Sequence, residues 1–474
     1  MITNNKKINK KGSAVAYALV MTAAVAIILT GIIQFLVAEI KFSEYTASKE
    51  EAFEVAEAGI YWYRWYLSHQ TVGKTALQIQ NFWNTGNPIA VGASACGHAG
   101  DYEVEYKDPS GAAIGKYCLQ VTPPVNGSTI VTVKSTGWTY KYPNSQRIIQ
   151  VRYRQPAWSE YIFLNNAYTD FGASANVQGK VFCNSVIRFD GVANNLVMSG
   201  VSSGYDSSVG ANKPGVWTSW SGGYNTTQSS NVFLAGTKFP VPTIDFATVT
   251  ADLSVLKSTA NSNGTVTNNC TATGCYFDNS NNGREIVLKS DGTFTVQKVN
   301  NYSSDTNSIS SYSGSAQTFN IPNNGVIYVE DNVWLRGTIN NKKVTVVAAN
   351  LLTSNMPTLF IENDIKYTNY NGNDVLGIVS QDDIQLTGNS EDNLEIDGAL
   401  VAQNGAIWRD SYGNAKTQLT IKGAMASHDT GGFYYSPHDG YQNRLYQFDN
   451  NLLYNPPPYF PTGSAYLLDL WQEL

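Results

Sequence analysis

The sequence carries little charge for its length. Asp, Glu, Lys and Arg make up 14% of its 474 residues, compared with about 25% in a typical soluble protein. The formal net charge is −6, and no basic patch follows the N-terminal lysines. This composition excludes the electrostatic footprint of a nucleic-acid-binding protein. Uncharged Asn, Ser, Thr and Gly, which crowd the chain after residue 200, must supply the polar surface, as is common on extracellular β-rich proteins.

Histidine and cysteine are also scarce. The four histidines are scattered along the chain, and the five cysteines lack the spacing of a zinc site. The sequence contains no Ser–His–Asp grouping, phosphate loop or nucleotide fingerprint. We therefore expect neither a metal site nor a cofactor.

The few cysteines that are present suit an oxidising compartment. Cys270 and Cys275, in "CTATGC", are placed to close a small disulfide loop. Cys96 and Cys118 flank a candidate strand pair and form a second candidate disulfide. Cys183 is left over, and we expect it to be buried or free.

A single long apolar run stands near the N-terminus. It follows four lysines, and the stretch from Gly12 to Ala38 carries no charge. Its length of about 27 residues exceeds the 7–15 apolar residues of a signal-peptide core, although a cleaved signal peptide remains an alternative. As a helix it would be about 40 Å long, enough to span a ~30 Å hydrocarbon core. The lysines place the N-terminus in the cytoplasm and everything from Lys41 onward outside it.

The predicted helix continues beyond the membrane. From Ala38 to Leu67 the chain has no proline, and its first glycine is Gly59. Small and apolar residues recur there at helical spacing among clustered acids. We expect one helix over residues 13–68, roughly 80 Å long, which is apolar all round in its first half and amphipathic in its second. An ordinary membrane anchor would end shortly after the bilayer.

Two regions after the helix have the patterns of β structure. Residues 69–156 contain four segments of alternating apolar and polar residues, which predict a small antiparallel sheet packed on the amphipathic half of the helix. Residues 157–320 form a Ser-, Asn- and Gly-rich β region. Within it we expect a helix in 242–262 and a hairpin at 284–299.

Residues 321–474 carry an irregular repeat. Short aliphatic runs alternate with the polar turns "EDN", "AAN", "END", "QDD", "QNG" and "HDT", spaced by roughly 14–25 residues, which is the range of solenoid coils. We expect a β-solenoid with a continuous aliphatic core. A β-sandwich, which also has short strands and Asn/Asp turns, is the alternative. The closing "PPPYFP" is expected to run extended along the surface, with a polyproline II ligand as the alternative.

The order of these motifs resembles that of type IV pilin-like proteins. A basic leader ends at Gly12, the apolar helix follows, and "EEAFEVAEAGIYW", which includes Glu57, Ala58 and Gly59, closes it. The segment is similar to that of PilX-type minor pilins, and "STGWTYKYPNSQRIIQVRYR" is similar to a strand pair of pilin globular domains. The resemblance implies that residues 1–12 are a leader, which a prepilin peptidase removes before Ser13, the residue then open to methylation. The rest of the chain resembles the solenoid-like extensions of large pilin-related proteins.

The sequence departs from this family at one position of the helix. Family members that pack within a filament usually have Glu at the fifth mature position, where this chain has Tyr17. An N-terminal ammonium without that carboxylate would be costly in an apolar filament core, so the departure favours a filament tip or an assembly-priming role. Small residues such as Gly31 permit close helix packing, and Thr22 and Gln34 are among the few polar side chains. A plain anchor without cleavage remains the alternative.

The β regions also contain candidate surface and catalytic residues. Trp334, Trp408, Tyr434 and Tyr435 fall near turns and are candidates for contact with a glycan or cell surface, with core packing as the alternative. Five aspartates could serve an enzyme, but they fall in turns, where Asp bonds the backbone: Asp364, Asp382, Asp383, Asp397 and Asp429. The turns "ENDIKY" and "QDDIQL" could instead hold calcium.

Taken together, the sequence predicts an α+β protein with a transmembrane, pilin-like helix, a small antiparallel β domain and a large β-solenoid-like domain. We expect a non-enzymatic minor pilin in the cytoplasmic membrane, with extracytoplasmic domains, that reaches the cell surface on assembly. Its expected partners are other pilin-like subunits, the assembly machinery and a glycan or cell surface. The alternative function is a membrane-anchored, glycan-active enzyme.

Overall fold

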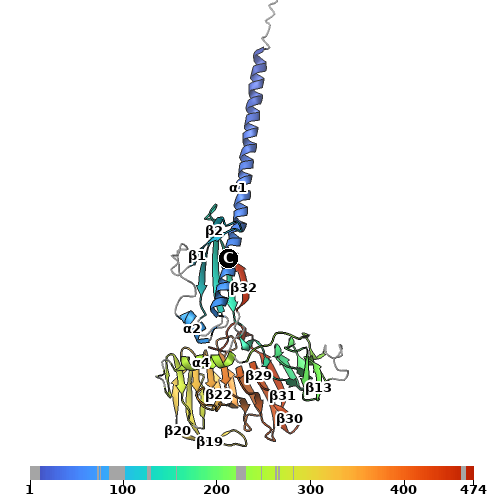
Figure 1. Ribbon diagram of the computed structural model, residues 1–474, viewed down its shortest axis with the longest axis vertical. Coiled ribbons are helices and arrows are strands. Elements are labelled where there is room, and N and C mark those ends of the chain that lie inside the picture. Colours follow the sequence, from blue (N-terminus) through green and yellow to red (C-terminus); the bar gives the residue numbers. More distant parts are fainter. Residues whose placement is uncertain are drawn as a thin grey trace, which may run out of the picture.

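The computed structural model describes residues 11–71, 74, 76–84, 102–124, 130–155, 157–219, 231–246, 248–261, 264, 267–280, 282–460 and 466–474. Three parts follow one another along its long axis: a free helix, a small helix–sheet domain and a broad β-solenoid (Figure 1). The predicted α+β class is confirmed.

The N-terminal helix α1 (Lys11–Thr71) is a single element of 61 residues. Its first half, residues 14–43, contacts no other described part of the chain, and we call it the free half. Its side chains, and those of the helix as far as Ala47, are exposed. Its second half packs on a sheet through a stripe of buried residues: Ala52, Val55, Ala56, Ile60, Tyr63 and Leu67. A short helix, α2 (Ala76–Asn84), follows. The expected division into a first half that is apolar and a second half that is amphipathic is confirmed.

Four antiparallel strands form the sheet as predicted: β1 (Tyr102–Lys107), β2 (Ala113–Thr122), β3 (Ile130–Thr139) and β4 (Arg147–Arg154). The structure adds a fifth strand, because β32 (Leu467–Glu473) returns from the C-terminus and pairs with the free edge of β4. Asp469 of β32 accepts a hydrogen bond from Arg152 Nε at 2.6 Å and forms an ion pair with Arg154 at 3.3 Å. The sequence pattern does not reveal this strand, and the expected assignment of all of residues 321–474 to the solenoid is wrong for β32.

Two glycines let the helix approach this sheet closely. A Cβ on Gly137 of β3 would lie 2.4 Å from the carbonyl oxygen of Ala52 and 2.4 Å from the amide nitrogen of Ala56, both in α1. A Cβ on Gly59 of α1 would lie 2.5 Å from Ser135 Oγ and 2.7 Å from Tyr117 Cδ2. The helix–sheet domain, as we call the second half of α1 with β1–β4 and β32, is therefore in backbone contact where the helix crosses β3.

The predicted solenoid is confirmed, and the sandwich alternative is wrong, because the strands stack in parallel coils with three faces. The first face contains, in order, β17 (Gly274–Phe277), β21 (Val326–Val329), β23 (Lys343–Ala348), β25 (Val375–Ser380), the second halves of β27 (Asn393–Ala402) and β29 (Ala415–Ser427), β5 (Phe163–Asn165), β8 (Val181–Cys183), β11 (Val197–Ser199) and β15 (Thr237–Lys238). At about 4.8 Å between strands, this face is roughly 45 Å long.

The other two faces are less continuous. The second face runs through β18 (Arg284–Leu288), β22 (Val333–Ile339), β24 (Leu359–Tyr367), β26 (Ile384–Leu386) and β28 (Ile407–Arg409), and then through a separate sheet of β6 (Thr169–Phe171), β9 (Ile187–Phe189) and β14 (Val216–Trp217). The third face joins the end of β24 and the first halves of β27 and β29 to β31 (Asp439–Phe448), β7 (Ala175–Gln178) and β10 (Val192–Ala193).

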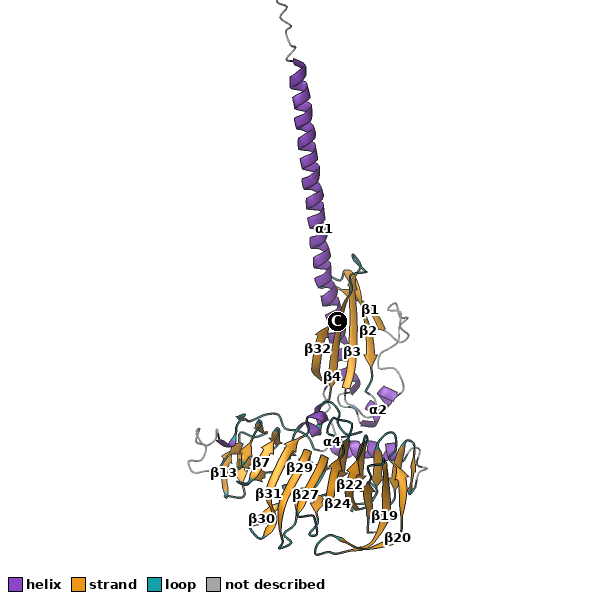
Figure 2. Ribbon diagram, turned by 180° about the vertical axis from the view of Figure 1, so that it is seen from behind, coloured by secondary structure: helices purple, strands orange, loops and turns teal. Residues whose placement is uncertain are grey.

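The order of these coils does not follow the sequence. The chain enters in the middle after η1 (Trp158–Glu160) and winds outward from β5 to β15. Residues 239–246 and α4 (Thr248–Ala260) then pack along the first face and return the chain to β17 at the other end. Figure 2 shows α4 along the edge of the solenoid that is nearest the small sheet. From β17 the chain winds back until β29 and β31 pair with β5 and β7. This junction, where β29 and β31 pair with β5 and β7, we call the seam. Because of it, the expected region 157–320 and the part of the expected region 321–474 that precedes β32 form one solenoid rather than two regions, whereas β32 belongs to the other sheet.

Two hairpins project from the coils, and two others border them. The projecting hairpins are β12 (Ser203–Asp206) with β13 (Ala211–Pro214), and β19 (Thr293–Tyr302) with β20 (Ile309–Asn320). The predicted hairpin at 284–299 is confirmed as β18 and the start of β19. β30 (Tyr434–Ser436) pairs with β31 near the seam. β16 (Asn269–Thr271) pairs with β17 at the end of the first face.

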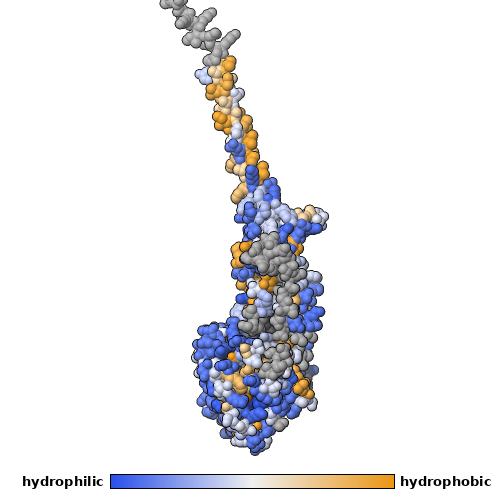
Figure 3. All heavy atoms as spheres, turned by 90° about the vertical axis from the view of Figure 1, so that its left-hand side faces the viewer, coloured by the Kyte–Doolittle hydropathy of each residue, from blue (hydrophilic) through white to orange (hydrophobic). Residues whose placement is uncertain are grey.

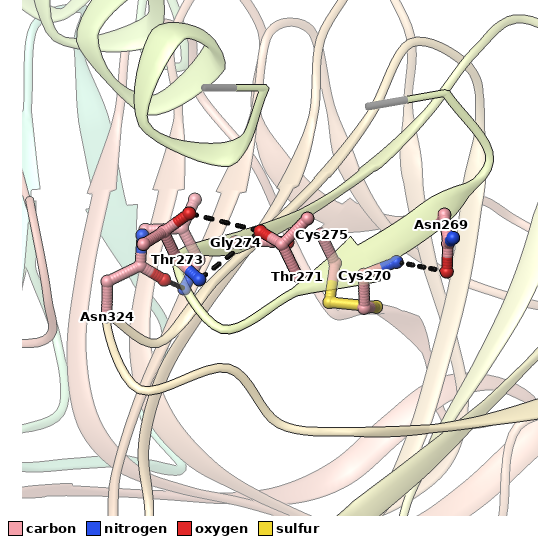
Figure 4. Close-up of a disulfide and its surroundings, with 8 residues drawn as sticks. Asn269, Cys270, Thr271, Thr273, Gly274, Cys275 and Asn324 are labelled. Atoms are coloured by element: carbon pink, nitrogen blue, oxygen red, sulfur yellow. Dashed lines mark hydrogen bonds between the residues drawn. A yellow bond between two sulfur atoms is a disulfide. The ribbon is translucent and has the colours of Figure 1, made fainter. Parts of the chain in front are cut away.

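The β16–β17 hairpin carries a disulfide (Figure 4). Cys270 and Cys275 lie opposite each other and are bonded, with their Cα atoms 4.1 Å apart. A Cβ on Gly274 would lie 2.6 Å from the Cα of Ala260, so the hairpin packs directly on the end of α4. Cys183 is buried and free. Cys118 is disulfide-bonded, and its predicted partner Cys96 lies outside the described residues.

The closing Pro-rich segment, expected to run extended along the surface, lies on the first face of the solenoid and is largely buried there. It follows η3 (Asn450–Leu453) and lies against the first face, where Thr345 Oγ1 donates to the carbonyl of Pro458 at 2.6 Å. Pro456 to Pro458 are buried, and Phe460 is 4% exposed. The segment covers apolar residues that the outer surface of β23 and β25 presents, which the local sequence does not reveal.

Candidate functional site

The free half of α1 is the first candidate site. Within the described residues it is the one helix long and apolar enough to cross a membrane, with a mean hydropathy of 2.4 in its most apolar window. Large apolar side chains are exposed along it, among them Val15, Leu19, Ile27, Ile28, Phe35 and Ile40, and orange residues run along the face of the helix that Figure 3 shows. No other described part of the chain covers them, so a lipid bilayer or other helices must do so.

The few polar side chains of this half are satisfied locally or lie free. Thr22 Oγ1 donates to the carbonyl of Ala18 at 3.0 Å, and Thr30 Oγ1 donates to that of Ala26 at 2.8 Å. Tyr17 is 73% exposed, and an added Cβ on Gly31 would meet no atom within 4 Å. Gln34 is exposed. Each predicted packing position is therefore accessible to another helix.

The predicted processing site lies at the start of the same helix. Gly12 and Ser13 are in its first turn, whereas residues 1–10 lie outside the described part of the chain. Cleavage between them stays a prediction. Of the other helix residues carried over from the resemblance, Gly59 is buried against the sheet, Ala58 is half-buried and Glu57 accepts a 3.4 Å hydrogen bond from Tyr61. These three residues belong to the helix–sheet domain and not to the free half.

The predicted surface aromatics separate into two groups. Trp334 is 3% exposed, stacks on Phe360 with ring centroids 4.8 Å apart and donates from Nε1 to the carbonyl of Asn307 at 2.8 Å. Its assignment to the surface is wrong, because the β19–β20 hairpin folds over the second face and buries it. Trp408 is half-buried. Tyr434 and Tyr435 are exposed by 41% and 45%.

Tyr434 and Tyr435 lie at the mouth of a cleft of about 320 Å³ at the seam. The first and third faces of the solenoid pair across the seam, but the second face does not, because the strand after β28 is replaced by β30, which pairs back on β31. β6 then begins a separate sheet. The cleft is the gap left between these two parts of the second face, and Ile407 and Phe171 from either side line it.

Two charged residues line the cleft that the sequence pattern does not mark as site residues. Asp170 of β6 and Arg444 of β31 both line it. Arg444 is 8% exposed, and its guanidinium lies 4.9 Å from the centre of the Tyr434 ring. Around Asp170, the surrounding protein desolvates the carboxylate and raises its pKa, while Arg188 and Arg444 oppose the shift. No local motif marks either residue, because the seam brings together positions far apart in the sequence.

Four of the five candidate aspartates, Asp364, Asp383, Asp397 and Asp429, make hydrogen bonds or an ion pair within the fold. Asp364 Oδ1 accepts from the amide of Glu395 at 2.8 Å, and Asp383 Oδ1 accepts from that of Ala406 at 2.7 Å. Asp429 Oδ1 lies 2.8 Å from His428 Nδ1. Among the described residues, no group of three His, Cys, Asp or Glu side chains is placed to hold a metal ion.

Two of these carboxyls have perturbed pKa values. Burial raises the pKa of Asp382 to about 6, with Asp383 and Asp429 adding to the shift, and burial likewise raises that of Asp397 to about 6. Raised values of this kind occur at catalytic acids. The charges that act on Asp382 are Asp383 and Asp429, whereas those that act on Asp397 are Glu395 and Lys422, so the two perturbed carboxyls do not act on each other.

Asp397 is expected to make the protein less stable as the pH rises. It is fully buried, and Oδ2 accepts from Tyr367 N at 2.8 Å and Tyr370 Oη at 2.7 Å. Because its pKa is higher in the folded chain than the ~3.9 of an unfolded aspartate, the folded state binds the proton more tightly, and stability is lost between about pH 4 and 6. Asp397→Asn keeps an oxygen acceptor and should raise stability at pH 7.5 by about 2 kcal/mol.

Thermal unfolding at pH 4.5 and 7.5 tests this expectation. The difference in Tm between the two pH values should be smaller in Asp397→Asn than in the natural protein. Asp305→Asn, at an exposed turn position, serves as the control and should leave the difference unchanged. Parallel pH profiles for all three proteins would contradict the assignment.

Comparison with known proteins gives distant structural likenesses and no sequence match. No family model and no curated protein matches the sequence. Among solved structures, the chain is similar to the competence-associated pilin ComZ from Thermus thermophilus, with 12% sequence identity and a TM-score of 0.33. The match covers 90% of this chain and 98% of that one.

Proposed function

We propose that this chain is a minor pilin-like subunit, of the PilX type, that takes part in the assembly of a type IV pilus-related filament and occupies its tip. The observation that carries the proposal is the division of α1 into a bare apolar half and a half that is locked to a sheet. A membrane anchor needs only the first. A helix that must carry a folded domain out of the bilayer needs both.

The chemistry of the free half supports transfer between lipid and filament. Its exposed apolar side chains can be covered equally by acyl chains or by neighbouring helices, so the two environments are close in free energy. Small residues at Ala14, Ala16, Ala18 and Gly31 allow other helices to approach. An external assembly motor can then move the subunit without a large penalty.

The position of the solenoid supports a tip location. It lies at the end of the helix–sheet domain that is opposite the free helix (Figure 1), and it extends to both sides of the helix axis over roughly 45 Å. Subunits stacked above would have to share that space. Tyr17, which replaces the carboxylate that filament-packed relatives use, is consistent with a subunit that has no neighbour above it.

Electron microscopy of filaments sheared from cells tests the proposal. A small epitope tag inserted in the exposed loop at residues 352–355, between β23 and β24, would be detected with gold-labelled antibody. We expect gold at filament ends. Gold along the shafts would contradict the tip position, and gold confined to cell bodies would contradict a role in the filament. The solenoid, exposed at such a tip, would meet other cells or surfaces first, which gives the chain an adhesive role.

A further inference from the structure

The cleft at the seam has the features of a ligand site that the assembly role does not use. At the seam, β29 pairs with β5 on the first face and β31 pairs with β7 on the third face. The cleft exists because the second face has no such pairing there. Its volume of about 320 Å³ is at the lower end of the range for small-ligand pockets, ~300–1,000 Å³. Apolar core residues form its floor, and polar residues surround its mouth.

Arg444 is the residue that points to an anion. It is 8% exposed, and its guanidinium donates to the carbonyl of Tyr441 at 2.7 Å and to Ser174 Oγ at 2.6 Å. No carboxylate oxygen among the described residues lies within ion-pair distance of it. The other strongly buried arginine of this region, Arg409, is paired with Asp439 at 3.2 Å. Buried charges are normally paired, whereas Arg444 has two hydrogen bonds and the field of Asp170 in the same cleft, which its charge affects without forming an ion pair. A bound anion would give it a direct partner.

The two tyrosines point to a flat ring. Tyr434 lies over the Arg444 guanidinium and Tyr435 donates from its hydroxyl to the carbonyl of Arg409 at 2.5 Å, so both rings are held in place. Both nevertheless remain exposed at the cleft. Fixed aromatic faces of this kind cover the apolar face of a sugar ring, while Asp170 and Asn165 on the opposite wall offer oxygen acceptors and an amide to hydroxyl groups.

We propose that the seam cleft binds a sugar residue bearing a carboxylate, as in a uronic-acid-containing glycan. The carboxylate would pair with Arg444, the ring would lie on Tyr434, and Asp170 would accept from a hydroxyl at the far end. The proposal names a ligand class for the adhesive role proposed above. Binding to the purified chain does not depend on filament assembly, so the two proposals can fail separately.

Calorimetry with the full chain in detergent tests the inference, with oligogalacturonate as the acidic probe and a galactose oligomer of equal length as the neutral one. We expect binding of the acidic probe, at least tenfold tighter than of the neutral one. Tyr434→Ala, at a 41%-exposed position that should not affect folding, should weaken binding at least tenfold. Arg444→Gln should abolish the preference for the acidic probe.

The control is Tyr205→Ala, which removes an aromatic side chain that is 63% exposed and not among the residues lining the cleft. It should bind like the natural protein. Equal affinity for the two probes would overturn the carboxylate assignment, and no binding of either, or unchanged binding in Tyr434→Ala, would overturn the site. If Arg444→Gln fails to fold, the test is competition by free galacturonate against free galactose, in which only the acidic monosaccharide should compete.

Discussion

Deleting residues 466–474 is expected to unfold the helix–sheet domain while the solenoid stays folded. The deletion removes Tyr466, which is 6% exposed in the core of the domain, and loss of a buried aromatic side chain costs about 3–5 kcal/mol. It also removes β32, so that β4 becomes an open edge with unpaired backbone groups. Hydrogen exchange should therefore accelerate at amides of β2–β4 and remain slow in β23 and β25.

A substitution in β32 removes its ion pairs while keeping the strand, so the effect of the charges can be separated from that of deleting residues 466–474. In the folded protein the Asp469 side chain is 12% exposed and pairs with Arg152 and Arg154. Asp469→Arg would place a third cation beside these two arginines. The free energy of opening should fall by about 2 kcal/mol or more. Glu105→Arg is the control, because its pair with Lys107 is exposed and should contribute less than about 1 kcal/mol. Unchanged exchange in the truncated chain would show that β32 does not belong to this domain.

Gly137→Ala is expected to separate α1 from the sheet. The added Cβ would lie 2.4 Å from backbone atoms of both Ala52 and Ala56, and backbone cannot rotate away as a side chain can. Helix and strand must move apart along their whole contact, at a cost of about 3 kcal/mol. Hydrogen exchange in β3 gives this free energy directly, because it reports local opening.

Gly59 and Gly31 of α1 give two comparisons for Gly137 of β3, because the same substitution meets different neighbours at each position. In Gly59→Ala the Cβ meets the side chains of Ser135 and Tyr117, which can shift, and alanine gains about 1 kcal/mol of helix propensity. Because Tyr117 is 4% exposed and Ser135 is 0% exposed, that shift still disturbs the core, so the net effect should be destabilising but smaller than that of Gly137→Ala. Gly31→Ala meets no atom within 4 Å and should not destabilise. Equal effects at all three positions would contradict the backbone contact between Gly137 and the helix.

The elements that the sequence predicts correctly are those set by local periodicity. The helix, the four strands β1–β4 and the 284–299 hairpin each follow from apolar spacing and turn residues within a short window. The solenoid follows from the repetition of such windows. In each case the buried face belongs to the element itself, so the pattern is visible without knowing the partner.

What the sequence does not reveal depends on partners that are distant in the chain. β32 has no distinctive alternation, since both of its faces are largely exposed, and its place follows only from pairing with β4 across 317 residues. The coil order likewise depends on which strand meets β29. Trp334 and the Pro-rich segment look exposed in a local window because the hairpin and the strands that cover them lie elsewhere.

The candidate sites divide in the same way. The free helix is a local feature, so Tyr17, Thr22 and Gly31 could be placed from sequence. Of the aromatic candidates, Tyr434 and Tyr435 lie in a cleft, but the charged residues that give this cleft its chemistry, Asp170 and Arg444, were not predicted. They come together across the seam, which is a property of the coil order.

The proposed function requires that α1 begins as a membrane helix and that cleavage at its cytoplasmic end precedes assembly. N-terminal sequencing of the mature protein, purified from the cells that make it, tests this requirement. We expect a chain that begins at Ser13, with the preceding twelve residues removed. A chain that still begins at Met1 would show a permanent anchor, and a chain that begins after the apolar run would show a secretory signal; either result would contradict the proposed function.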